Sequence, residues 1–135
     1  MEIIYKEESY QIMGACFEAY REMGCGLKEL VYHECLEKEF RHRKIPAVHE
    51  PIMELEYKGE KLKNTFEPDF ICFKKIILEL KSVSALNDQH RAQVHNYLRA
   101  SSLKLGILVN FGHYPKVEFE RIIIDNQAQE PPRLK

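Results

Sequence analysis

The sequence has 135 residues, of which 44% are hydrophobic and 30% are charged, and its formal net charge is −1. This length predicts a single domain, and the composition is ordinary for a folded globular chain. The nearly neutral charge argues against a protein that coats nucleic acid electrostatically, because such binding neutralises several phosphates with Lys and Arg. No apolar run approaches the ~18 residues that span a bilayer. The N-terminus has no secretory pattern, so we expect a cytoplasmic protein without membrane contact.

Two helices are predicted in the first third of the chain. Apolar residues from Ile12 to Met23 recur at spacings of four, three and four, which indicates one face of a helix over residues 7–23. The Gly24-Cys25-Gly26 turn ends this helix, because glycine supplies the freedom for a tight turn. A second helix is expected over residues 27–43, in a segment rich in good helix formers.

After residue 46 the apolar pattern becomes that of strands. Met53, Leu55 and Tyr57 alternate with two glutamates, as in a half-exposed strand. The expected strands cover residues 53–57, 66–73, 76–83, 105–111 and 117–124. Asn87 is a suitable N-cap for a third helix over residues 88–100.

The element order is therefore ααβββαββ, which predicts an α/β sandwich rather than a strictly alternating doubly wound fold. Residues 105–111 are almost continuously apolar, so we expect helices to cover this strand on both faces. We assign residues 1–125 to one domain. Residues 126–135, with Pro131-Pro132, are expected to form a loose C-terminal tail.

The cysteines and histidines give no metal-binding pattern. The four cysteines include no Cys-x-x-Cys pair, and three of them lie nine and ten residues apart, which is poor spacing for zinc. We expect reduced, mostly buried thiols at Cys16, Cys25, Cys35 and Cys72. Surface or packing roles are expected for His33, His42, His49, His95 and His113, which form no metal-binding spacing. His90, three residues before Gln93, could face the same cleft as Gln93.

Two charged residues stand in an apolar stretch in the middle of the chain, residues 70–83. Glu79 and Lys81 are two apart on a predicted strand, so they project from one face while Leu78 and Leu80 project from the other. Charges beside a buried strand are costly unless they are paired or bind a metal, which favours a functional site here. A solvent-facing Glu-x-Lys alternation is the alternative.

Asp69 joins this face only in one register of the neighbouring strand. A two-residue hairpin at Lys74-Lys75 would place Asp69 opposite Leu80, on the other face. A three-residue loop or a single bulge shifts the register by one and brings Asp69 onto the face of Glu79. A shared site therefore requires an odd loop or a bulge between residues 73 and 77.

Grouped in this way, the residues suit phosphodiester chemistry. Asp69, Glu79 and the backbone carbonyl of Leu80 would supply the hard oxygen ligands that Mg²⁺ or Mn²⁺ prefers. Such an ion polarises a scissile phosphate and lowers the pKa of an attacking water. Lys81 would orient that water or stabilise the developing negative charge.

The third predicted helix adds a weaker signal. Gln93 and Tyr97 are four residues apart, so they share one helix face and could contact the phosphate or brace the site. Tyr97 could equally be a core aromatic whose hydroxyl is hydrogen-bonded.

The order of these residues resembles the RecB-like branch of the PD-(D/E)xK nuclease superfamily. Asp69, then Glu79-Leu80-Lys81, then Gln93-x-x-x-Tyr97 as the helix motif follow one another as in that superfamily. Residues 26–32, Gly-Leu-Lys-Glu-Leu-Val-Tyr, read as Gly-x-x-Glu-x-x-Tyr. This segment is similar to the small stand-alone GxxExxY family within the superfamily.

The resemblance implies a three-layer, restriction-endonuclease-like core with a central mixed sheet of about five strands flanked by helices. It also implies that Asp69 and Glu79 are metal ligands, that Lys81 is the catalytic lysine, and that Glu29 is a helix-borne acid near the metal. By itself Glu29 would be an ordinary surface acid favoured by the helix dipole. The chain lacks the cysteine set that would hold an iron–sulfur cluster.

Two functional hypotheses follow. The first is an Mg²⁺- or Mn²⁺-dependent nuclease that acts on DNA, with RNA as an alternative substrate. The second is a catalytically silent nuclease-fold module that binds nucleic acid or a protein partner, which the near-neutral charge favours. Either is compatible with a homodimer that uses the exposed strand 117–124 as an edge.

Overall fold

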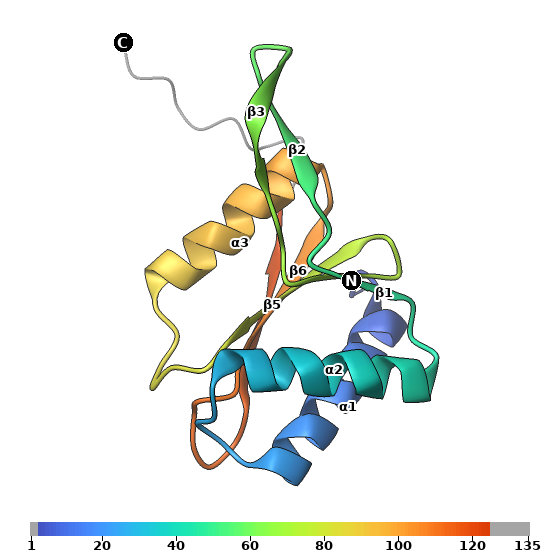
Figure 1. Cartoon of the computed structure of the whole chain (residues 1–135), viewed down its shortest axis with the longest axis vertical. Helices are drawn as coiled ribbons and strands as arrows, with labels where there is room; N and C mark the ends of the chain where they lie inside the picture. The colour runs from blue at the N-terminus through green and yellow to red at the C-terminus, as the bar shows by residue number, and fades with distance from the viewer. Residues whose placement is uncertain (1–2, 125–135) are drawn as a thin grey trace.

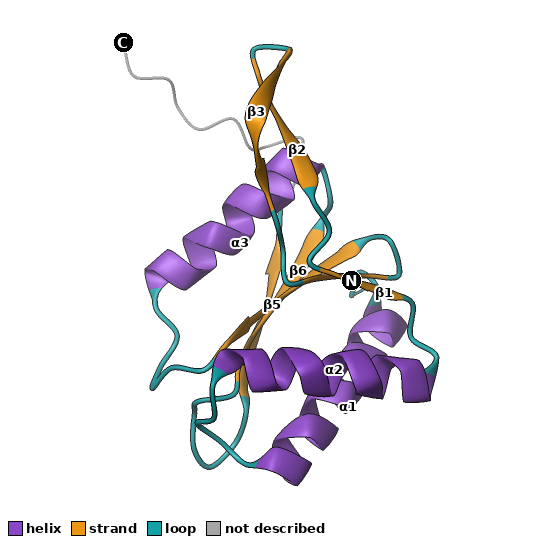
Figure 2. Cartoon of the chain, viewed as in Figure 1, coloured by secondary structure: helices purple, strands orange, loops and turns teal. Residues whose placement is uncertain are grey.

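The computed structural model describes residues 3–124, which form three helices and seven strands (Figures 1 and 2). The helices are α1 (Lys6–Met23), α2 (Glu29–Arg43) and α3 (Asp88–Ser101). The strands are β1 (Ala47–His49), β2 (Met53–Tyr57), β3 (Glu60–Phe66), β4 (Phe70–Cys72), β5 (Ile76–Lys81), β6 (Leu105–Asn110) and β7 (Glu118–Ile123).

A five-stranded mixed sheet forms the middle layer, in the order β1-β4-β5-β6-β7. β5 and β6 are parallel, and the connection between them runs through α3; the other neighbours in this sheet are antiparallel. α1 and α2 lie against one face of the sheet and α3 lies against the other (Figure 2). The predicted α/β fold, with a mixed sheet of about five strands between helical layers, is confirmed.

Alternate residues of the central strands build a core on each face of the sheet. Leu78 and Leu80 of β5 belong to the core under α1 and α2. Ile77 of β5 and Leu108 of β6 belong to the core under α3. Every residue of β6 is buried, which confirms the strand that was expected to be covered on both faces. By the same alternation Glu79 and Lys81 lie on the α3 side of β5.

The predicted order ααβββαββ omits two strands. β3 pairs with β2 in a separate two-stranded hairpin that extends away from the rest of the fold (Figure 1). Residues 60–65 are all exposed, so no alternation of apolar and polar residues marks β3 in the sequence. β1, the other omitted strand, has only three residues.

The segment predicted as one strand over residues 66–73 is divided in the structure. Phe66 ends β3, and β4 begins at Phe70. Pro68 lies in the break, where its missing N–H costs no ladder hydrogen bond. The division directs the chain from the β2–β3 hairpin into the central sheet just before β4, so Asp69 stands at the entrance to the sheet.

Two predicted helix boundaries have clear physical causes. The Asn87 side chain accepts a 3.1 Å hydrogen bond from the N–H of His90, which confirms Asn87 as the N-cap of α3. Gly26 has a φ of +87°, a conformation that favours glycine, and its N–H donates to the carbonyl of Phe111 at 3.0 Å. α2 then begins at Glu29, two residues later than the sequence predicts.

All four cysteines are free thiols: Cys16 and Cys72 are buried, Cys35 is half-buried and Cys25 is exposed. Within residues 3–124, no helix is both long and apolar enough to cross a membrane. The predicted tail, residues 126–135, lies outside the described residues.

Candidate active site

The loop between β4 and β5 determines which face Asp69 occupies. Cys72 pairs with Ile76, so the loop consists of three residues, 73–75. Phe73 and Lys74 both have positive φ, and the N–H of Lys75 donates to the carbonyl of Cys72 at 3.1 Å. Phe73 and Lys74 therefore form a tight two-residue turn of the type favoured in hairpins. Lys75 is the third residue of the loop and makes its length odd. The odd loop that the hypothesis required is confirmed.

This register brings Asp69 beside Glu79. The main-chain N–H of Asp69 donates to Oε1 of Glu79 at 2.8 Å, and the N–H of Leu80 donates to Oδ2 of Asp69 at 2.7 Å. Each carboxylate is thus held by a backbone amide of the opposite strand. Hydrogen bonds from N–H groups to carboxylates are among the stronger ones in proteins, so both side chains have a fixed orientation.

The two carboxyl groups are crowded and poorly hydrated. Glu79 is only 3% exposed, and its burial, followed by the nearby charge of Asp69, raises its pKa to about 8. Burial also raises the pKa of Asp69 above its ordinary value. Unfavourable carboxylate ionisation of this kind is relieved when a cation lies nearby. The pair is therefore suited to a divalent ion.

Glu29 and His33 reach the same place from α2. Nε2 of His33 lies 3.4 Å from Oε2 of Glu29 and 3.6 Å from Oδ2 of Asp69. Burial by itself would lower the pKa of His33, but the hydrogen bond to Glu29 and the charges of Asp69 and Glu29 outweigh that effect and raise it. The structure thus places Glu29 on α2 close to Asp69, and its expected role as an acid near the metal stays a prediction.

His33 and its neighbour His49 were not identified from the sequence. His33 is buried, and its Nδ1 lies 2.9 Å from Nε2 of His49. The available signal was the spacing of Glu29 and His33, which are four residues apart and so share one face of a helix. His49 gave no such signal, because it belongs to β1 and meets His33 only in the folded chain.

Lys81, Gln93 and Tyr97 form a line of hydrogen bonds from β5 to α3. Nζ of Lys81 donates to Oε1 of Gln93 at 3.1 Å, and Nε2 of Gln93 donates to the hydroxyl of Tyr97 at 3.2 Å. The Tyr97 ring also packs on Phe66, with ring centroids 4.9 Å apart. Gln93 and Tyr97 therefore brace the lysine, and Tyr97 contributes to packing as well.

Tyr32, the last residue of the Gly-x-x-Glu-x-x-Tyr pattern, packs in the core and does not reach the candidate metal ligands. It is fully buried and stacks on Phe111 with ring centroids 4.3 Å apart. Its hydroxyl donates to the carbonyl of Gly24 at 2.6 Å and accepts from the N–H of Leu27 at 3.2 Å. Tyr32 thereby fixes the turn from which α2 presents Glu29.

The donor atoms fit a hard divalent cation. One carboxylate oxygen each from Glu29 and Asp69 and one nitrogen of His33 all lie within 4.8 Å of one another. Glu79 stands beside this group through its bond to the N–H of Asp69. Mg²⁺ and Mn²⁺ both bind carboxylate oxygens. An imidazole nitrogen favours Mn²⁺, because it is a transition metal.

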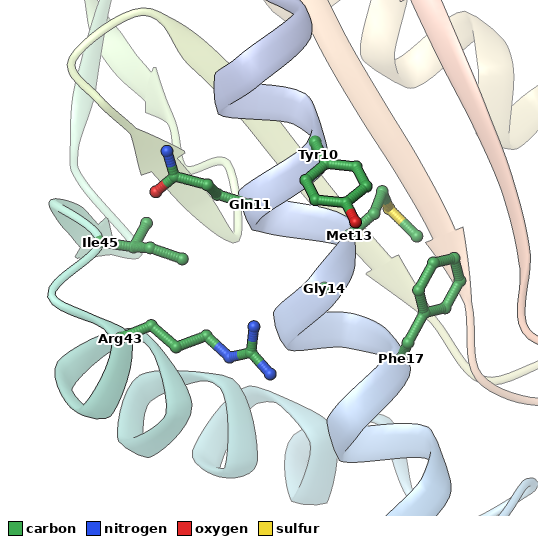
Figure 3. A pocket seen from close by; sticks show the side chains of 7 residues that line it. All are labelled: Tyr10, Gln11, Met13, Gly14, Phe17, Arg43 and Ile45. Carbon is green, nitrogen blue, oxygen red and sulfur yellow. The ribbon is translucent and has the colours of Figure 1, made fainter.

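A separate surface hollow of about 500 Å³ lies between α1 and the end of α2 (Figure 3). Its lining residues are Tyr10, Gln11, Met13, Gly14, Phe17, Arg43 and Ile45. The Arg43 side chain reaches across to α1 and packs over Gly14. A side chain at that position would have little room, because a Cβ there would lie 3.0 Å from Nη1 of Arg43. The lining residues include neither an acid nor a histidine, so this hollow offers no carboxylate or imidazole ligand and does not extend the candidate active site.

The mixed sheet between helical layers, with a buried and a half-buried acid at the β4–β5 pair, has the form of a restriction-endonuclease-like α/β fold. The model of the PD-(D/E)XK nuclease superfamily matches residues 6–122. That match covers most of the 135 residues, and the chain belongs to the PD-(D/E)XK nuclease superfamily.

The fold is also found among solved structures. The crystal structure of SSO0001 is similar to this chain with a TM-score of 0.56 and 22% sequence identity, over 92% of this chain and 60% of the other. The chain thus spans 60% of the length of that protein, and at this identity the likeness shows the fold alone. No curated protein matches the chain.

Proposed function

We propose that this protein is an Mg²⁺- or Mn²⁺-dependent nuclease that hydrolyses phosphodiester bonds of DNA. The observation that carries the proposal is the approach of Glu29 to the Asp69–Glu79 pair, with Lys81 on the same face of β5 as Glu79. Three acids and a lysine crowded at one place are costly for folding unless the charges are paired, hydrogen-bonded or bound to a metal. Membership of the PD-(D/E)XK nuclease superfamily supports a metal-dependent nuclease site here.

Asp69, Glu79 and Glu29 would hold the ion, with the backbone carbonyl of Leu80 as a further oxygen ligand and His33 as a nitrogen ligand. A divalent ion bound there polarises the scissile phosphate and makes a water nucleophilic near neutral pH. The backbone amides that hold Asp69 and Glu79 orient the two carboxylates before substrate arrives. Pre-oriented groups lose little freedom on reaching the transition state.

Lys81 would act on the reacting phosphate. Its ammonium group would hold the attacking water or stabilise the negative charge that develops on phosphate oxygens. The hydrogen bond to Gln93 limits the freedom of this flexible side chain, and Tyr97 holds the Gln93 amide in turn. Gln93 and Tyr97 would thus contribute by positioning Lys81.

We also propose that the chain is a GxxExxY member of the RecB-like branch. The positive φ of Gly26 and the buried Tyr32 hydroxyl support this assignment, because both build the turn that presents Glu29. DNA as the substrate, with RNA as the alternative, follows from the superfamily rather than from a basic surface. A homodimer through β7, an outer strand of the five-stranded sheet, stays a prediction.

The experiment is a cleavage assay with linear duplex DNA, single-stranded DNA, closed circular DNA and RNA, in Mn²⁺, Mg²⁺ or EDTA. Asp69→Asn keeps an oxygen that accepts from the Leu80 amide but removes the charge, and Lys81→Ala removes the ammonium group. Glu22→Gln, on the exposed end of α1, is the matched control. Metal-dependent cleavage lost in Asp69→Asn and Lys81→Ala but kept in Glu22→Gln supports the proposal. A folded wild type that binds metal and nucleic acid without cleavage would instead indicate the silent module.

A further inference from the structure

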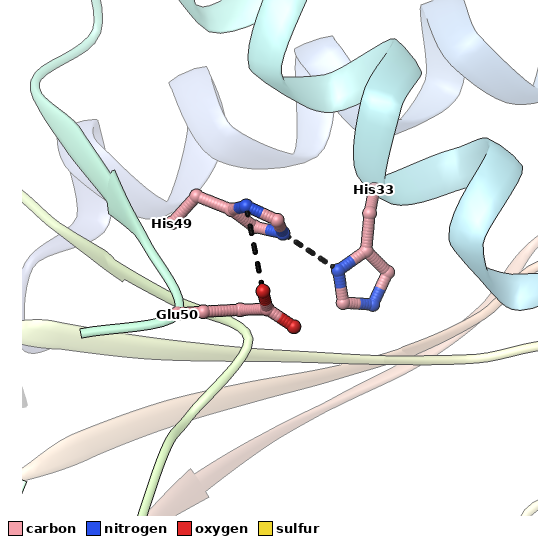
Figure 4. A group of neighbouring side chains, drawn as sticks. All are labelled: His33, His49 and Glu50. Carbon is pink, nitrogen blue, oxygen red and sulfur yellow. Dashed lines mark hydrogen bonds and ion pairs between the residues drawn. The ribbon is translucent and has the colours of Figure 1, made fainter. Parts of the chain in front are cut away.

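A pair of histidines connects the candidate metal site to the protein surface. His33 of α2 and His49 of β1 lie with Nδ1 and Nε2 2.9 Å apart, and their rings are inclined at 76° (Figure 4). His33 is 3% exposed, whereas His49 is half-buried. A contact of 2.9 Å between two ring nitrogens requires that one of them carries the hydrogen and the other accepts it.

The two outer nitrogens of the pair both face carboxylates. Nε2 of His33 is 3.4 Å from Oε2 of Glu29. At the other end, Nδ1 of His49 is 3.6 Å from Oε2 of Glu37 and 3.9 Å from Oε1 of Glu50. A cation bound at Nε2 of His33 excludes a hydrogen from that nitrogen, so the neutral ring carries its hydrogen at Nδ1. Glu37 and Glu50 favour a hydrogen on Nδ1 of His49, which leaves Nε2 of His49 to accept. With the cation bound, the hydrogen between the rings therefore belongs to Nδ1 of His33.

We infer that His49 is a positioning residue for the metal site: it accepts the Nδ1–H of His33 and so leaves Nε2 of His33 free to bind the divalent cation between Glu29 and Asp69. This inference rests on the proposed function. A metal-ligating histidine commonly donates its other N–H to a nearby acceptor, which fixes both the tautomer and the ring orientation. Here the acceptor is a second histidine, and Glu37 and Glu50 orient it.

The main chain holds this arrangement in register with Asp69. His49 pairs with Phe70 in the β1–β4 ladder, and the N–H of Glu50 donates to the carbonyl of Asp69 at 2.8 Å. The segment that carries His49 is therefore hydrogen-bonded to the segment that carries the candidate metal ligand. Movement of His49 relative to Asp69 would break these bonds.

One competing explanation uses the same atoms. One ring nitrogen each from His33 and His49 and a carboxylate oxygen of Glu50 lie within 4.8 Å of one another, so with Nδ1 of His33 and Nε2 of His49 as its nitrogen ligands they could form a separate transition-metal site. In that case both inner nitrogens would bind metal and neither would carry a hydrogen. The two explanations therefore differ in the protonation of Nδ1 of His33.

The test measures Mn²⁺ affinity by calorimetry for the wild type, His49→Leu and His49→Gln, with His42→Ala on exposed α2 surface as the control. We expect His49→Leu to weaken Mn²⁺ binding by about 10–100-fold, the usual effect of losing a partner of a metal ligand. His49→Gln should restore most of the affinity, because its amide oxygen accepts from His33. His42→Ala should bind as the wild type does.

Nitrogen NMR of the wild type gives a second readout that needs no substitution. With diamagnetic Cd²⁺ bound, His33 should be ligated through Nε2 and protonated at Nδ1. Metal ligation at Nδ1 of His33, or unchanged Mn²⁺ affinity in a folded His49→Leu, would overturn the inference while leaving the nuclease proposal intact. A folded wild type that binds no Mn²⁺ would overturn the proposed function and this inference together.

Discussion

Asp69 and Glu79 lie side by side at the end of the β4–β5 pair, and the N–H of Asp69 donates to Oε1 of Glu79 at 2.8 Å. The next amide along β5, that of Leu80, holds the Asp69 carboxylate in return. The geometry of the candidate active site is thus determined by the main chain of two paired strands. The two carboxylates are oriented by backbone amides without an ion or substrate, and the contribution of each group can be tested by substitution.

The stability of the metal-free protein should fall as the pH rises. The pKa of Glu79 is raised from 4.5 to about 8, so between these values the folded chain binds more protons than the unfolded chain. The stability gained from the protonated carboxyl is complete below about pH 4.5 and is lost as the pH rises through about 8. Chemical denaturation in EDTA at several pH values measures this slope.

Glu79→Gln should flatten that pH dependence, because the amide does not titrate. Glu22→Gln, a substitution of an exposed acid, should keep the wild-type slope. A wild type and a Glu79→Gln variant with the same slope would show that Glu79 titrates normally.

Binding of Mn²⁺ should become stronger over the same pH range. The ion must displace the proton from Glu79, so metal affinity rises as the pH approaches about 8 and proton release accompanies binding below it. Calorimetry in buffers of different ionisation enthalpy measures the number of protons released. Glu79→Gln should bind Mn²⁺ more weakly and with less proton release; equal release in both proteins would contradict this role.

Tyr32→Phe should destabilise the fold without changing any group of the metal site. The substitution removes the hydroxyl that bonds to Gly24 and Leu27, and it leaves the Gly24 carbonyl without this partner. The expected loss is about 1–2 kcal/mol of unfolding free energy, as for other hydrogen bonds of buried groups. Tyr10→Phe is the control, because Tyr10 is 79% exposed and should show no measurable change. A fully stable Tyr32→Phe would contradict the structural role.

Gln93 and Lys81 should act as one unit in catalysis. Gln93→Ala frees the ammonium group of Lys81 from its 3.1 Å bond, so we expect the cleavage rate to fall by about tenfold, with little change in metal affinity. In a Lys81→Ala background the same substitution should have almost no further effect. Independent, multiplicative effects in the double variant would show that Gln93 acts on substrate by itself.

Binding to DNA without metal should be weak. With a formal charge of −1 the chain offers few uncompensated cations, so we expect low affinity in EDTA and a shallow dependence on salt. Ca²⁺, which takes the same kind of carboxylate oxygen ligands, should strengthen DNA binding in the wild type but not in Asp69→Asn. Tight binding in EDTA, measured by fluorescence anisotropy, would point to a basic surface instead.

The short-range patterns of the sequence determined much of the architecture. The alternation around Leu80 placed Glu79 and Lys81 on one face of β5, and the apolar run of β6 implied a strand covered by helices on both sides. Asn87 marked the start of α3 through a bond that spans only three residues. Each of these features depends on side-chain periodicity or on contacts within one turn of chain.

Tertiary structure decided what depends on partners far apart along the chain. Residues of β3 are exposed until Phe66, so only pairing with β2 identifies that strand. The register of β4 against β5 depended on a loop whose length the sequence left open. His33 and His49 meet because α2 packs near β1, and no local pattern encodes a contact between two surfaces that folding brings together. The sequence therefore specified the acids of the site, whereas their distances and their histidine neighbours were set by packing.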